Sequence, residues 1–161
     1  MTKEKLLEIR NLETAFRIKD DYFNAVDKVS LDLYRNEVLA IVGESGCGKS
    51  TLATTVMGLH NENLTKSTGE VIFNGKNLLE LTEEEMNKIR TKDIGMIFQD
   101  PLSSLNPLHR IGKQIEEALI YHTELSAAER EKRVIELLTQ VGIPNPERCA
   151  KQYPHELSGG M

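Results

Sequence analysis

The chain has 161 residues, of which 28% are charged and 39% hydrophobic, with a net charge of −5 and a sequence pI of about 5.5. This length suits one domain with a sizeable core, and the acidic balance disfavours a nucleic-acid binder, which usually carries a basic face. The longest apolar run, residues 38–42, is far shorter than the roughly 20 residues of a membrane span, so we expect a soluble chain in the cytosol. The spacing of Cys47 and Cys149 predicts free thiols.

The first part of the chain has the alternating pattern of β-strands that have one solvent-exposed face. Residues 7–9 and 29–33 alternate apolar with polar side chains, which predicts two half-buried strands, and Phe16 falls in or beside their connection. Asn36 tolerates the left-handed conformation and therefore predicts a tight turn. The turn leads into the apolar run 38–42, which we interpret as a buried strand.

A glycine-rich loop follows that run, and a helix to about Leu59 is predicted after it. The loop reads Gly43-Glu44-Ser45-Gly46-Cys47-Gly48-Lys49-Ser50-Thr51 and matches the phosphate-binding pattern G-x-x-x-x-G-K-[ST] in its strand and helix context. Each glycine costs about 0.5–1 kcal/mol of backbone entropy relative to alanine, and a lysine at a helix start opposes the helix dipole. A bound nucleotide triphosphate explains both, with loop amides and Lys49 on the phosphates and Ser50 on Mg²⁺. The alternative is a glycine-rich turn that carries Lys-Ser by chance.

Further strands and helices are predicted beyond this helix. Residues 70–73 read as a strand closed by the Asn74-Gly75 turn, and Thr82 with Glu85 has capping-box spacing for a helix to about Arg90. The apolar run 94–98 predicts a second buried strand that ends at Gln99.

The composition changes after Gln99 to an all-helical pattern. Helices are predicted over about 110–121 and, from a second capping box at Ser126 and Glu129, to about Val141. We therefore divide the chain into a nucleotide-binding β and core part, residues 1–99, and a helical subdomain, residues 100–161. The last residues, Leu157-Ser158-Gly159-Gly160, could place backbone donors near a phosphate, although a flexible terminus is the better explanation when they are taken alone.

Three elements now stand in a fixed order: the phosphate loop, a glutamine at the end of an apolar strand, and Leu-Ser-Gly-Gly after a helical insert. With these the chain resembles, over essentially its whole length, the ATP-binding subunits of ABC transporters. Three shorter stretches of the sequence are similar to one branch of this family, the oligopeptide and dipeptide importers, which also includes nickel importers. These stretches are Phe98-Gln99-Asp100-Pro101-Leu102-Ser103-Ser104-Leu105-Asn106-Pro107, Tyr153-Pro154-His155 and Met161.

This resemblance implies an α/β P-loop fold with an antiparallel β layer, an incomplete parallel core sheet and a helical subdomain. It implies ATP and Mg²⁺ as cofactors, and two ATPase subunits head to tail, each ATP lying between one subunit's phosphate loop and the other's Leu-Ser-Gly-Gly. Phe16 would stack on adenine, with Tyr22 as second choice and ordinary core packing as the alternative. The resemblance also implies that Gly43 to Thr51 bind ATP and that Ser50 binds Mg²⁺. Gln99 would approach Mg²⁺ and the attacking water. Ser158, Gly159 and Gly160 would contact the ATP that the partner subunit holds.

The implied function is an ATPase that powers peptide import, peripheral on the inner face of the cell membrane, with permease subunits as partners and a substrate-binding protein as an indirect one. The Walker B aspartate and the glutamate that polarises water have no counterpart in the chain, so we expect it to bind nucleotide without turnover. Two alternative functions remain open. The first is a soluble ABC-type ATPase of DNA repair or translation, and the second is a regulatory nucleotide-binding module.

Overall fold

A computed structural model describes residues 4–90, 92–100, 104–158 and 160–161. The chain separates into two units, Met1–Arg90 and Thr91–Met161, which are described one after the other. The motif boundary predicted at Gln99 lies inside the second unit and stays a prediction. Among the described residues, no helix is long and apolar enough to cross a membrane.

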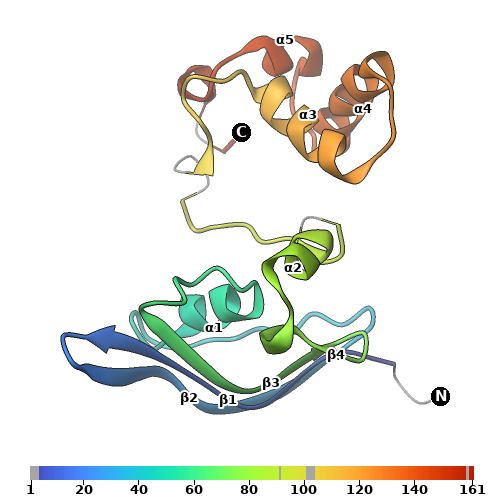
Figure 1. Ribbon diagram of the computed structural model, residues 1–161. Coiled ribbons are helices and arrows are strands. Elements are labelled where there is room, and N and C mark those ends of the chain that lie inside the picture. Colours follow the sequence, from blue (N-terminus) through green and yellow to red (C-terminus); the bar gives the residue numbers. More distant parts are fainter. Residues whose placement is uncertain (1–3, 91, 101–103, 159) are drawn as a thin grey trace. The chain divides into compact units, whose positions relative to one another are not determined.

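The first unit contains a four-stranded antiparallel sheet in the order β2-β1-β3-β4. Its strands are β1 (Lys5–Ile18), β2 (Asp21–Tyr34), β3 (Thr65–Phe73) and β4 (Lys76–Asn77). Helix α1 (Lys49–Val56) lies over one face of this sheet, as Figure 1 shows. The buried side chains that hold it together are Ile9, Leu12, Ala15, Val26, Leu52, Met57, Val71 and Phe73.

The strands predicted at residues 7–9, 29–33 and 70–73 are confirmed, and so are two of the turns. Asn36 has φ 59°, and the Asn74-Gly75 turn has φ 48° and 77°, as a tight hairpin requires. The position of Phe16 differs from the prediction. It lies inside β1, paired with Phe23 of β2, because the connection consists only of the turn at residues 19–20.

The buried strands predicted at residues 38–42 and 94–98 are wrong for the described structure. Residues 38–42 form no strand, and the second run has only an isolated bridge at Ile94. Val38, Val42 and Ile97 are 95%, 88% and 91% exposed. A parallel core strand must pair with a neighbouring strand and be covered on both faces. The sheet of the described residues is entirely antiparallel, so the predicted parallel core sheet is not formed there.

Two short elements complete the first unit, the 3₁₀ helix η1 (Leu78–Glu80) and helix α2 (Glu83–Ile89). Thr82 caps α2 as predicted. Its hydroxyl accepts a hydrogen bond from the backbone amide of Glu85, and the Glu85 carboxylate accepts one from the backbone amide of Thr82 at 2.9 Å. The acidic residues in the first turn of α2 therefore stabilise the N-terminus of this helix.

The second unit is helical. It contains α3 (Ile111–His122), α4 (Ala127–Gln140), α5 (Pro146–Lys151) and the 3₁₀ helix η3 (Pro154–Glu156), so the predicted helices are confirmed. Ser126 and Glu129 form the predicted capping box, and Gly142 ends α4 with φ 78°. The core is small and consists of Ile111, Val134, Leu138 and Cys149.

Candidate nucleotide-binding site

The glycine-rich loop predicted to hold phosphates leads directly into α1. Gly48 is the N-cap of this helix with φ 93°, and Gly46 has φ 83°. A Cβ atom added to Gly48 would lie 2.3 Å from the carbonyl oxygen of Ala25, whereas one added to Gly46 would meet nothing within 4 Å. The base of the loop is therefore pressed against β2, and its middle remains open.

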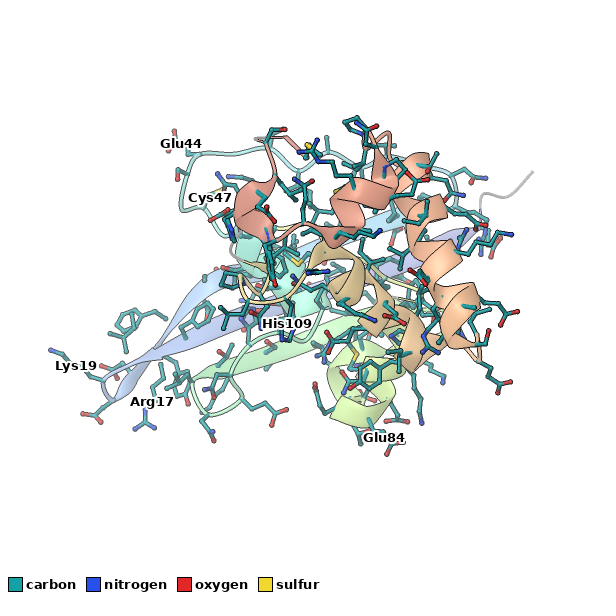
Figure 2. All side chains as sticks on the ribbon, turned by 90° about the horizontal axis from the view of Figure 1, so that it is seen from above. Arg17, Lys19, Glu44, Cys47, Glu84 and His109 are labelled. Atoms are coloured by element: carbon teal, nitrogen blue, oxygen red, sulfur yellow. The ribbon has the colours of Figure 1, made fainter. Side chains whose placement is uncertain are left out.

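Lys49 folds its side chain back over the loop. Its Nζ donates hydrogen bonds to the carbonyl oxygens of Gly43 at 2.8 Å and Glu44 at 2.6 Å, and lies 3.4 Å from Cys47 Sγ. Figure 2 shows Glu44 and Cys47 on the same loop. The ammonium group thus stands at the inner side of the loop, where it can exchange neutral carbonyl acceptors for phosphate oxygens, which bind it more strongly.

The N-terminus of α1 carries no capping side chain. No side chain accepts a hydrogen bond at its N-cap, and its first turn contains no acidic residue. The first amides of a helix need acceptors and carry a partial positive charge, so a phosphate group would satisfy both needs. Ser45 and Ser50 are exposed, and Thr51 is half-buried, at this end of the helix.

The residues around Ser50 also fit Mg²⁺. No group of three His, Cys, Asp or Glu side chains that could hold a metal occurs among the described residues. Mg²⁺ binds through few protein oxygens and takes waters and nucleotide phosphates as its remaining ligands. The hydroxyl of Ser50, beside Lys49 at the start of α1, is an oxygen that could serve as such a ligand.

A partly buried polar cluster, which sequence reasoning did not find, fastens α1 to the sheet. It consists of Thr14, Thr54, Thr55 and His60 and is called the threonine–histidine cluster below. Thr14 Oγ1 of β1 lies 3.0 Å from Thr55 Oγ1 of α1, and His60 Nε2 lies 3.0 Å from the same hydroxyl and 3.1 Å from that of Thr54. Threonine at three positions of a short helix was the available signal, but hydroxyl pairing depends on the fold.

Arg90 holds the opposite end of α1. Its Nε donates to Met57 O at 2.9 Å and its guanidinium to Gly58 O at 2.6 Å, while a salt bridge joins it to Glu83 of α2. A cation at the C-terminal carbonyl groups of a helix is favourable for the dipole. The phosphate-loop helix is therefore fixed at its far end by α2.

The two aromatic candidates for adenine stacking differ in their surroundings. Phe16 is half-buried and meets the His60 ring edge to face, with ring centroids 5.2 Å apart and an interplanar angle of 87°. Tyr22 is exposed, and the ammonium of Lys66 lies 4.1 Å from the centroid of its ring. Phe16 is thus tied to the phosphate-loop helix through His60, whereas Tyr22 is not.

The remaining predicted site residues belong to the second unit. Gln99 and Ser158 are exposed, Gly160 has φ 93°, and the amide of Met161 donates to Ser158 O at 3.1 Å. Gly159 lies outside the described residues. The roles predicted for these residues stay predictions.

Comparison with known proteins gives matches over nearly the whole chain. The family model described as ABC transporter matches residues 26–161. The chain is 50% identical over 161 residues to the oligopeptide transport ATP-binding protein OppD of Lactococcus lactis subsp. cremoris (strain SK11), covering 100% of this chain and 48% of that protein. It is 46% identical over 159 residues to the dipeptide transport ATP-binding protein DppD of Bacillus subtilis (strain 168), covering 98% and 48%.

Among solved structures, the dimeric structure of MJ0796, a bacterial ABC transporter cassette, matches with a TM-score of 0.82 and 30% identity, covering 96% of this chain and 64% of that one. A second structure of MJ0796, with the same TM-score of 0.82, is a dimeric post-hydrolysis state bound to ADP and Pi. The resemblance to ABC ATP-binding subunits and the P-loop ATPase fold class are confirmed by these matches. The chain spans about half the length of the curated relatives that it matches.

Proposed function

Because the chain belongs to the ABC transporter family, we propose that it is the ATP-binding part of a subunit that hydrolyses ATP to drive the import of oligopeptides or dipeptides. The observation that carries the proposal is the Lys49 ammonium, held over the phosphate loop at the uncapped start of α1. The names of the relatives, which are oligopeptide and dipeptide transport ATP-binding proteins, support peptides as the cargo.

In the proposed complex, the loop residues Gly43 to Thr51 surround the triphosphate. Backbone amides at the N-terminus of α1 bind phosphate oxygens, Lys49 turns from the loop carbonyls to the β- and γ-phosphates, and Ser50 ligates Mg²⁺. Mg²⁺ would neutralise charge that develops on the transferred phosphoryl group. The protein contributes positioning and charge stabilisation, and Phe16 stacks on the base.

The second unit supplies the remaining proposed contacts. Gln99 approaches the attacking water and Mg²⁺, and Ser158, Gly159 and Gly160 contact the ATP held by a second ATPase subunit. The solved dimers of the MJ0796 cassette support this arrangement. We propose membrane-embedded permease subunits as further partners and a substrate-binding protein as an indirect one, with the protein on the cytoplasmic face of the cell membrane.

The nucleotide proposal is tested by Lys49→Ala in the full-length protein, with Mg·ATP binding measured by calorimetry. A hydrogen bond to a charged group contributes about 1.5–3 kcal/mol, so we expect ATP affinity to fall at least tenfold. Lys88→Ala is the matched control, because Lys88 is an exposed lysine paired with Glu84 on α2. Unchanged affinity in a folded Lys49→Ala variant contradicts the proposal. Uptake of a labelled peptide into cells that carry either variant tests the cargo.

A further inference from the structure

We propose that His60 is a positioning residue: it holds the Phe16 ring against α1, so that the base and the triphosphate of ATP are bound at a fixed separation. The inference rests on the proposed function, because it takes Phe16 as the residue that stacks on adenine. It goes further by giving a role to His60, which lies outside the phosphate loop and outside every motif found in the sequence.

One end of this connection is the ring pair. Phe16 and His60 meet edge to face, with centroids 5.2 Å apart and planes at 87°. This is a favoured geometry for aromatic rings, because the positive edge of one ring meets the negative face of the other. Phe16 remains half-buried, so its ring is supported by His60 while part of it is still accessible.

The other end is a set of polar contacts to α1. His60 Nε2 lies 3.1 Å from Thr54 Oγ1, 3.0 Å from Thr55 Oγ1 and 3.4 Å from the carbonyl oxygen of Thr51. All three partners belong to α1, the helix whose first residue is Lys49. A single side chain therefore joins the candidate base platform to the candidate phosphate site.

The hydrogen-bonding groups around the His60 imidazole fit together in one arrangement. Thr55 Oγ1 lies 2.7 Å from Thr51 O and Thr54 Oγ1 lies 2.9 Å from Ser50 O, so each hydroxyl can give its one hydrogen to the helix backbone. Both hydroxyl oxygens are then acceptors, and they match a hydrogen on His60 Nε2. One hydrogen on His60 Nε2, shared between the two hydroxyl oxygens, is consistent with these distances.

Such a connection reduces the motion that ATP binding would have to suppress. A ligand that contacts two separately moving parts loses affinity to their ordering, and a preformed link between them lowers this loss. Only a ligand with both a base and a triphosphate gains from the link. Inorganic tripolyphosphate contacts the loop alone and gains nothing.

The test is a double-mutant cycle in the full-length protein, with His60→Gln, Phe16→Ala and the double variant. Glutamine keeps an N–H donor but removes the ring. We expect His60→Gln to weaken Mg·ATP binding about threefold to tenfold, the range given by an aromatic pair, and to change tripolyphosphate binding less than about twofold. In the Phe16→Ala background, His60→Gln should have no further effect on ATP. His109→Gln, in the second unit, is the control (Figure 2).

Folding of each variant is checked by thermal unfolding. A cavity of about 280 Å³ beside His60 gives substituted side chains room. If His60→Gln does not fold, His60→Phe replaces it, because it keeps a ring but loses the contacts of Nε2 to α1, and the same pattern is expected.

The outcomes separate this inference from the proposed function. Equal losses for ATP and tripolyphosphate, no loss for ATP, or an undiminished His60→Gln effect in the Phe16→Ala background overturn the role of His60 alone. Phe16→Ala without effect on ATP overturns it too, while the Lys49 result still stands. A wild-type protein that does not bind ATP overturns both.

Discussion

The hydroxyl groups of Thr14 and Thr55 lie 3.0 Å apart in the interior of the first unit, where Thr14 is 0% and Thr55 3% exposed. Thr14 belongs to β1 and Thr55 to α1, so this hydrogen bond joins the sheet to the helix that follows the phosphate loop. Ser67 Oγ of β3 lies 3.4 Å from the same Thr14 hydroxyl. The site is thus supported by polar side chains as well as by apolar packing.

Thr14→Val should destabilise the protein by about 1–3 kcal/mol, because it removes the hydrogen-bond partner of the buried Thr55 hydroxyl while keeping nearly the same shape. The free energy of unfolding in urea measures the effect. Thr14→Ser, which keeps the hydroxyl, separates the loss of the hydrogen bond from the loss of a methyl group. A Thr14→Val protein as stable as wild type would show that the hydroxyl pair contributes nothing to stability.

Local features of this chain could be predicted from the sequence because they depend on neighbouring residues. The capping boxes at Thr82 and Ser126 and the left-handed turn residues Asn36 and Asn74 formed as expected. Each involves residues within a few positions of one another, so their geometry is set by backbone conformation and short hydrogen bonds. The glycine-rich loop is local in the same way, and its phosphate-binding role stays a prediction.

Features that depend on distant partners were missed or misjudged. The run 38–42 has the composition of a buried strand but finds no neighbouring strand among the described residues, and Val38 is 95% exposed. The threonine–histidine cluster joins residues 41 positions apart, Thr14 and Thr55, and no local pattern announces such a pair. Apolar composition indicates that a segment can form a buried strand, but the strand forms only where a neighbouring strand is available to pair with it.

Gly48→Ala should disturb the phosphate loop more than Gly46→Ala does. Both residues have positive φ, which strains alanine, but only at Gly48 would the new Cβ lie 2.3 Å from a backbone oxygen, that of Ala25. Relieving that contact requires the start of α1 to move away from β2. We expect a lower unfolding midpoint and weaker ATP binding for Gly48→Ala, with Gly46→Ala as the matched variant. Equal effects of the two substitutions would mean that backbone strain, and not the contact with Ala25, causes the loss of stability and of ATP affinity.

The ion pairs of Glu116 should make the second unit sensitive to acid. Lys113 Nζ lies 2.7 Å and Arg130 Nε 3.2 Å from the Glu116 carboxylate, and the hydrogen bond from Lys113, followed by that from Arg130, holds its pKa below the ordinary value of 4.5 despite partial desolvation. The unfolded chain therefore takes up this proton more readily. The contribution of Glu116 to stability is fully present above pH 4.5 and is lost as the pH falls through the lowered pKa.

Glu116→Gln should accordingly weaken the fall in stability below pH 4.5, the ordinary pKa of this carboxyl group. The unfolding midpoint measured over a pH series checks this, with Glu117→Gln, on an exposed position of α3, as control. The two variants behaving alike would show that Glu116 has no special part in acid denaturation.

The two cysteines should differ in reactivity, and the difference should report on nucleotide binding. Cys47 is an exposed free thiol in the phosphate loop, with the Lys49 ammonium 3.4 Å from its sulfur. Cys149 is 2% exposed in the helical core, and burial raises its pKa, so it offers little thiolate to a reagent. A water-soluble maleimide should therefore label Cys47 first, as mass spectrometry of the digested protein would show.

Bound Mg·ATP should slow the labelling of Cys47 and leave Cys149 unchanged. The triphosphate would cover the inner side of the loop, and Lys49 would turn from Gly43 and Glu44 toward it, so the reagent would lose access to the sulfur. Lys49→Ala provides the control, because with weak ATP binding its Cys47 should react equally fast with and without nucleotide. Labelling of Cys47 that is indifferent to saturating ATP in the wild type would place the nucleotide away from this loop. Protection of Cys149 as well would indicate a change in folding and not occupancy of the site.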